Sequence, residues 1–104
     1  MSNKVSLIAK LTAAEGKADE LAASLANLIA AAEEEAGLEV YSAHADQNDP
    51  QVFWFFEVYS DSDALAVHGK GDQMKAAMGA LGGLLGGRPE VTMMTPVVAK
   101  GIAV

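Results

Sequence analysis

The sequence predicts an α+β fold of the ferredoxin-like kind, in which a four-stranded antiparallel sheet carries two helices on one face. Several short segments alternate between apolar and polar residues, which is the period of half-buried strands. Two other segments repeat apolar residues at spacings of three and four, which is the period of helices. The order is therefore βαββαβ, and the length of 104 residues fits a single domain over residues 1–104.

The first half of the chain predicts a strand, a helix and a second strand. Residues 5–11 alternate, and Thr12 to Glu15 have the spacing of a capping box, so we expect the helix to begin there. Gly37 is placed to end it, and residues 38–46 predict the second strand. The apolar stripe of this helix comprises Ala18, Leu21, Leu25, Leu28, Ile29 and Ala32.

The second half begins with a polar turn over residues 47–50 and a third strand over residues 51–59, so that strands two and three form a hairpin. Ser60 to Asp63 predict a helix cap, and the helix runs through His68. Two glycines interrupt it before a second apolar stripe, which ends at residues 86–89, and residues 91–99 predict the last strand. The interrupting glycines are Gly69 and Gly71, and the stripe comprises Met74, Ala77, Met78, Leu81 and Leu85.

Composition excludes several classes of function. The formal net charge of -7, with seven dispersed basic residues, disfavours nucleic-acid binding. The absence of cysteine excludes disulfides, thiolate metal sites and a thiol nucleophile. We find no apolar run long enough for a membrane span and no secretory signal, and we expect a cytoplasmic protein without a membrane partner.

Five of the six aromatic residues fall in the third predicted strand, between Phe53 and Tyr59. Alternation sends them to both faces of the sheet, although the helices can cover only one. We therefore expect the uncovered face to pack against a second copy of the chain, giving a homodimer. The residues expected at this interface are Val52, Trp54 and Phe56, with scattered surface apolar residues as the alternative.

The segment from Phe55 to His68, followed by Met74 and by a Pro89 and Pro96-Val97 ending, resembles the antibiotic biosynthesis monooxygenase (ABM) family. This resemblance implies a homodimeric α+β barrel. It also implies an enzyme that oxidises a small phenolic or quinol-like aromatic molecule with O₂ and no cofactor. Membership implies the fold and the dimer more strongly than the reaction.

The resemblance also implies the catalytic residues. His68 would act as a base that takes a phenolic proton, and Tyr59 would hydrogen-bond the substrate oxygen. The alternative for His68 is a structural histidine bonded to a backbone carbonyl or to a carboxylate such as Glu57. The expected substrate-binding residues are Phe53, Phe55, Glu57, Met74, Met78 and Met93, of which Glu57 and the methionines could instead be structural.

No metal site is expected. His44 and Asp46 share one face of the second strand, and His44 could join His68 in a facial triad only if the fold brought them together. Haem degradation is disfavoured because the first-strand asparagine of that branch of the family has no counterpart between Val5 and Thr12. Two further hypotheses remain open: a non-catalytic dimeric protein that binds a small ligand, and an isomerase or lyase of a small metabolite.

Overall fold

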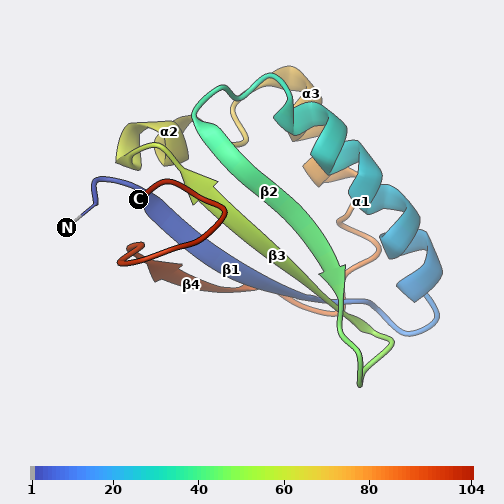
Figure 1. Cartoon of the computed structure of the whole chain (residues 1–104). Coiled ribbons are helices and arrows are strands. Elements are labelled where there is room, and N and C mark those ends of the chain that lie inside the picture. Colours follow the sequence, from blue (N-terminus) through green and yellow to red (C-terminus); the bar gives the residue numbers. More distant parts are fainter. Residues whose placement is uncertain (1) are drawn as a thin grey trace.

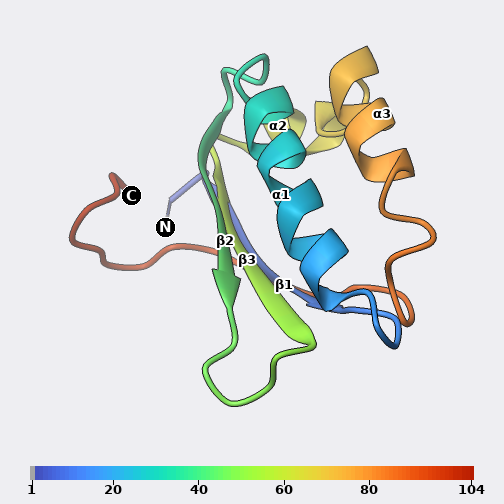
Figure 2. The ribbon, with the colours of Figure 1, turned by 90° about the vertical axis from the view of Figure 1, so that its right-hand side faces the viewer.

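The computed structural model describes residues 2–104, which form one antiparallel sheet with helices on one face (Figures 1 and 2). The strands are β1 (Val5–Thr12), β2 (Leu38–Ala45), β3 (Val52–Tyr59) and β4 (Glu90–Met94). The helices are α1 (Ala18–Ala32), α2 (Ser62–Val67) and α3 (Asp72–Gly79). The strand order β2-β3-β1-β4 is that of a ferredoxin-like sheet, and the predicted fold class is confirmed.

The core lies between the sheet and α1. Leu21, Leu25 and Leu28 of α1 are buried, as the predicted stripe required, against Leu7 and Leu11 of β1. The helix-facing residues of β3 join the same cluster, and they are Phe53, Phe55 and Tyr59. Burial of these large side chains supplies the main stabilisation of the fold, at roughly 1.5–3 kcal/mol for each.

The predicted capping box at Thr12 is wrong. Thr12 is the last residue of β1, where it pairs with Val52. Its carbonyl accepts a hydrogen bond from the Gly86 N–H at 2.8 Å, and the Ala13 N–H donates to the Gln51 carbonyl at 2.8 Å. These long-range backbone bonds hold the segment extended, and α1 begins only after Gly16, whose φ of 74° turns the chain.

The predicted helical stripe after Gly71 is shorter than expected. α3 ends at Gly79, since glycines at 82 and 83 add further cost to a helical continuation. Leu81 is nevertheless buried, and Leu85 forms an isolated bridge with Ala13, the residue after β1. The residues after α3 thus cover the sheet as a turn-rich segment, which forms part of the roof of the cavity described below.

The last strand is also shorter than the predicted 91–99. β4 ends at Met94, and Pro96, which lacks a backbone N–H, follows two residues later. The C-terminal segment then passes to the side of the sheet opposite the helices (Figure 2). Within residues 2–104, none of the helices has the length and apolar character that crossing a bilayer requires.

Candidate active site

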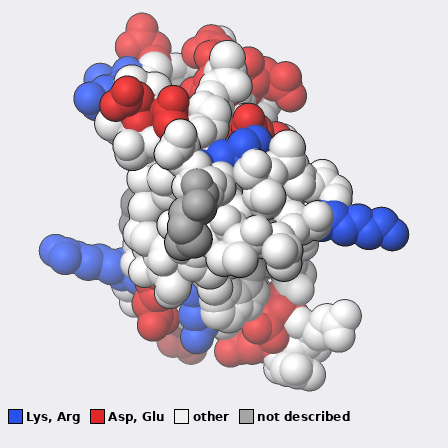
Figure 3. Space-filling model, turned by 60° about the vertical axis from the view of Figure 1, so that its left-hand side comes forward, with Lys and Arg blue, Asp and Glu red and all other residues white. Residues whose placement is uncertain are grey.

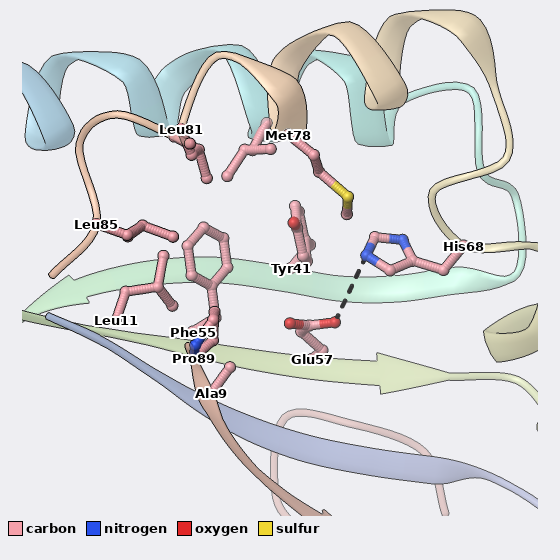
Figure 4. Close-up of a pocket in the computed structure, with 12 residues that line it drawn as sticks. Ala9, Leu11, Tyr41, Phe55, Glu57, His68, Met78, Leu81, Leu85 and Pro89 are labelled. Atoms are coloured by element: carbon pink, nitrogen blue, oxygen red, sulfur yellow. Dashed lines mark ion pairs between the residues drawn. The ribbon is translucent and has the colours of Figure 1, made fainter. Parts of the chain in front are cut away.

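A cavity of about 280 Å³ lies between the sheet and the helical layer (Figure 4). One end is apolar and includes Leu11, Phe55 and Leu81, while His68 and Glu57 lie at the other end. The full lining comprises Ala9, Leu11, Leu28, Tyr41, Phe55, Glu57, His68, Met78, Leu81, Gly82, Leu85 and Pro89. An apolar cavity with a few polar groups gathered at one end is the usual form of a small-molecule site.

His68 is held at the end of α2. The helix is capped at its start by Asp61, whose carboxylate accepts a hydrogen bond from the Ala64 N–H at 2.8 Å, as the sequence predicted. The His68 N–H donates to the Leu65 carbonyl at 3.1 Å, and Gly69 with a φ of 83° then turns the chain away. The imidazole is thereby directed into the cavity on a short, well-capped element.

Two carboxylates flank the His68 ring. Nδ1 lies 2.7 Å from Oε1 of Glu35, and Nε2 lies 4.0 Å from Oε1 of Glu57. The rings of Tyr41 and Tyr59 each meet it edge-on, with centroids 5.5 Å away. The imidazole therefore has one ring nitrogen tied to a carboxylate, while the other lies on the side of Glu57 within the cavity (Figure 4).

Glu57 lies in the middle of β3 and is 6% exposed. Its Oε1 accepts a hydrogen bond from the Tyr59 hydroxyl at 2.5 Å. Burial raises the pKa of the Glu57 carboxyl, and the hydrogen bond from Tyr59 and the nearby His68 oppose this rise. A buried carboxyl with a raised pKa, 4.0 Å from an imidazole, is a candidate acid–base group.

Tyr59 is fully buried behind Glu57 and does not line the cavity. Burial, followed by the hydrogen bond to Glu57, raises the pKa of its hydroxyl. Tyr59 therefore remains a protonated donor to Glu57. This geometry places it beneath the carboxylate, where it supports Glu57 instead of reaching into the cavity.

Tyr41 is a lining residue that the sequence reasoning missed. It pairs with Glu57 across the β2–β3 ladder, and its ring lies 4.9 Å from that of Phe55. Burial raises the pKa of its hydroxyl, with further contributions from the negative charges of Glu57 and Glu35. The alternation of β2 puts Tyr41 on the helix-facing side, and this was the signal that could have found it.

Glu35 was also missed. It follows α1 within the run Glu33 to Glu35, which by composition resembles a solvated helix end. Its pairing with His68 joins residues 33 apart in the chain, a distance over which spacing gives no information. The sequence suggests Glu57 as a carboxylate partner for a structural His68, but the hydrogen bond is made to Glu35.

The predicted substrate-binding residues occupy three kinds of place. Phe55, Glu57 and Met78 line the cavity. Phe53 and Met74 belong to the buried core around it, and Met93 lies on β4 with 53% of its surface exposed. The structure therefore brings together His68, Glu57, Phe55 and Met78 from the sequence-based set, and it adds Tyr41 and Glu35.

The predicted interface residues lie on the helix-free side of β3. Trp54 and Phe56 are partly exposed, whereas Val52 is buried. The Trp54 indole N–H donates to Asp46 at 2.9 Å, and the Lys10 ammonium lies 5.8 Å from the ring centroid. The hydrogen bond to Trp54, followed by those from backbone N–H groups of the turn, lowers the pKa of Asp46.

His44 lies opposite Trp54 on the same helix-free side, hydrogen-bonded to Ser42 at 2.8 Å. His68 lies on the helix side of the sheet. The two histidines therefore cannot share a metal ion, and no cluster of three metal-ligating side chains occurs among residues 2–104.

Comparison with known proteins agrees with this architecture. The profile of the family described as "Antibiotic biosynthesis monooxygenase" matches residues 4–80. The chain belongs to this family. No curated protein matches the sequence.

Among solved structures, the chain is similar to PA3566 from Pseudomonas aeruginosa, with 30% identity and a TM-score of 0.83 over 94% of this chain and 98% of that one. A Caulobacter crescentus protein named as a candidate antibiotic biosynthesis monooxygenase is 28% identical, with a TM-score of 0.84 over 93% and 92% of the two chains. NE2512 from Nitrosomonas europaea, a protein of unknown function, is 27% identical, with a TM-score of 0.81 over 97% and 96%. The structural relatives of this chain thus include a protein without an assigned reaction.

Proposed function

We propose that this ABM-family protein is a cofactor-independent monooxygenase that oxidises a small, neutral phenol or quinol with O₂. The observation that carries the proposal is the pairing of His68 and Glu57 at the polar end of an otherwise apolar cavity. Aromatic and methionine side chains suit a flat ring, and the two acid–base groups suit its hydroxyl.

The reaction begins with proton transfer. Nε2 of His68 takes the hydroxyl proton of the substrate, and the resulting anion gives one electron to O₂. The radical pair joins at a ring carbon that carries hydrogen, forming a C–O bond. The imidazolium of His68 returns the proton to the peroxide anion. Loss of water from the resulting hydroperoxide breaks the O–O bond and the ring C–H bond and leaves a carbonyl. The substrate supplies every electron, one oxygen atom of O₂ enters the product and the other leaves as water.

The charge around the cavity favours a neutral substrate. No lysine or arginine is among the described residues that line it, whereas Glu57 lines it and Glu35 lies directly behind His68. A phosphorylated or carboxylated ligand would meet two carboxyl groups without a fixed positive partner other than the imidazole. We therefore expect uncharged phenols and quinols to bind more tightly than their acidic analogues.

The functional unit is proposed to be a homodimer formed through the helix-free face. Ile8, Trp54 and Phe56 are adjacent on this face and only partly buried within one chain. Figure 3 shows a side of the molecule whose middle is largely uncharged, with charged side chains gathered mainly toward its rim. An apolar centre with a charged rim is the usual composition of a protein interface. Sedimentation velocity should give a dimer, and a monomer at micromolar concentration would rule this out.

The test of the reaction is oxygen uptake with a panel of neutral quinols and polyphenols, with metals and flavin removed. Wild-type protein should consume oxygen, and His68→Ala should lose at least about 100-fold of this rate, the usual contribution of a general base. His44→Ala is the matched control, because His44 lies on the helix-free face, away from the cavity. Sedimentation velocity must show that this variant has the same oligomeric state as the wild type. Equal uptake by His68→Ala and the wild type would exclude the base role.

A second candidate uses the same pair of groups without oxygen. Two acid–base residues separated by 4.0 Å can move a proton between two positions of one substrate, which is the chemistry of an isomerase. Turnover that continues under nitrogen would favour this candidate. Binding of apolar ligands, unaffected by His68→Ala and without turnover, would favour a binding protein.

A further inference from the structure

Glu35 has no place in the mechanism above, although its side chain is only 12% exposed. Oε1 lies 2.7 Å from Nδ1 of His68, while Oε2 is buried and has no hydrogen-bond partner among residues 2–104. Burying a carboxylate oxygen without a hydrogen-bond partner costs free energy of folding. The contact with His68 is the one strong interaction that offsets this cost. Exposed ion pairs elsewhere, such as Lys17 with Glu20, carry no such cost.

The contact between Glu35 and Nδ1 determines which ring nitrogen of His68 carries the hydrogen atom. An ionised carboxylate can only accept hydrogen bonds, so Nδ1 must carry a hydrogen atom. In the neutral ring, Nε2 then bears the lone pair, and it is Nε2 that faces Glu57 and the cavity. Without Glu35, a neutral imidazole can place its hydrogen on Nε2 and lose its ability to accept a proton from a ligand.

Backbone contacts fix this arrangement. The Glu35 N–H donates to the Ala32 carbonyl at 2.9 Å, and its carbonyl accepts from Leu38 at 3.0 Å. The following loop is locked against the start of α2, because the Gly37 carbonyl accepts from the Ser60 N–H at 2.8 Å. A Cβ at Gly37 would lie 2.5 Å from that of Ala64. The loop and α2 therefore fix the position of Glu35 relative to His68.

We propose that Glu35 is a positioning residue that keeps His68 in the Nδ1–H form, with Nε2 free to act as the base. This inference rests on the proposed function for its catalytic meaning. The tautomer of His68 can be measured whether or not the protein catalyses a reaction. The other titratable groups facing the ring are Glu57, Tyr41 and Tyr59, and none of them lies within hydrogen-bond distance of Nδ1 in the described structure.

The test combines imidazole ¹⁵N NMR with kinetics on Glu35→Gln. Glu34→Gln is the matched control, because it removes the same charge from the neighbouring, exposed position. At mildly alkaline pH the wild type and the control should show a protonated Nδ1 and an unprotonated Nε2 for His68. In Glu35→Gln the Nε2–H form should become substantial, and kcat should fall about 10–100-fold with KM nearly unchanged, as for other residues that orient a reactive group.

The two proposals fail in different ways. A wild-type His68 found mainly in the Nε2–H form, or a tautomer that Glu35→Gln leaves unchanged, would overturn the positioning role. The wild-type spectrum alone decides this point if the variant does not fold. The expected tautomer change, in a protein that never consumes oxygen, would support the positioning role and remove the monooxygenase proposal.

Discussion

The two faces of β3 differ in how their polar groups are satisfied. On the helix side, Glu57 and Tyr59 are buried and bonded to each other, and their neighbour His68 arrives from α2. On the opposite side, Trp54 bonds to Asp46, and both remain in reach of solvent. Adjacent residues of one strand thus serve different purposes. The buried face carries Glu57 of the proposed catalytic pair, and the open face carries the proposed dimer surface.

The neighbouring phenylalanines provide the sharpest contrast between these faces. Phe55 is 2% exposed and packs beside Tyr41, so Phe55→Ala should lower the free energy of unfolding by about 3–5 kcal/mol. Urea denaturation followed by circular dichroism would measure this. A loss below about 1 kcal/mol would show that the helix-facing core rearranges freely around the cavity.

Phe56→Ala should act mainly on association. Phe56 lies on the helix-free side opposite Ile8, and truncating a large aromatic at the centre of an interface weakens binding about tenfold or more. Sedimentation across a dilution series would give the dissociation constant of the dimer. The imidazole NMR signals of His68 should not move, and a dissociation constant equal to that of the wild type would exclude Phe56 from the interface.

Glu57→Gln should change how stability depends on pH. Burial raises the pKa of Glu57 above its ordinary value of 4.5, so the folded protein retains this proton more strongly than the unfolded chain. That contribution is present below 4.5 and is lost as pH rises through the folded-state value. Glutamine still accepts from Tyr59 but does not ionise, so the variant should lose less stability over this window. Urea midpoints measured from pH 4 to pH 8 would test it, and parallel curves would contradict it.

The smallest effect is expected at Asp46→Asn on the exposed side. The hydrogen bond from Trp54 lowers the pKa of Asp46 below 3.8, so its contribution is present above that value and is lost as pH falls through the folded-state value. The variant should therefore show a weaker decline in melting temperature in acid, and at neutral pH only a slight decrease. A large decrease at neutral pH would mean that the Asp46 contact with Trp54 is more than a surface interaction.

Local patterns predicted those parts of the fold that local contacts determine. The hairpin from Leu38 to Tyr59 and the Asp61 cap depend on alternation, turn residues and one side-chain oxygen, all readable within a few positions. The capping box at Thr12 failed because strand pairing to β3 outweighed a local preference. Helical spacing after α3 correctly indicated that Leu81 is buried, although the segment is not helical there.

The candidate site was less accessible to sequence reasoning. Phe55 and Glu57 followed from alternation along β3, and the position of His68 was implied by the family resemblance. Glu35 could be found only from its contact with His68, which joins a loop to a helix end and which no sequence periodicity reveals. Tyr41 required the register of β2 against β3, which becomes definite only once the hydrogen-bonded ladder is known.

Because Gly37 lies so close to Ala64, we expect substitutions in the loop after α1 and in the short helix α2 to occur together in related sequences. Any side chain at position 37 would push Ala64 away and would move His68 relative to Glu35 without touching either of them. Relatives that carry a larger residue at this position should therefore also differ at positions 35 and 68. The presence of a glutamate, a glycine two residues later and a histidine at the end of the next short helix offers a criterion for sorting ABM-family sequences by chemistry.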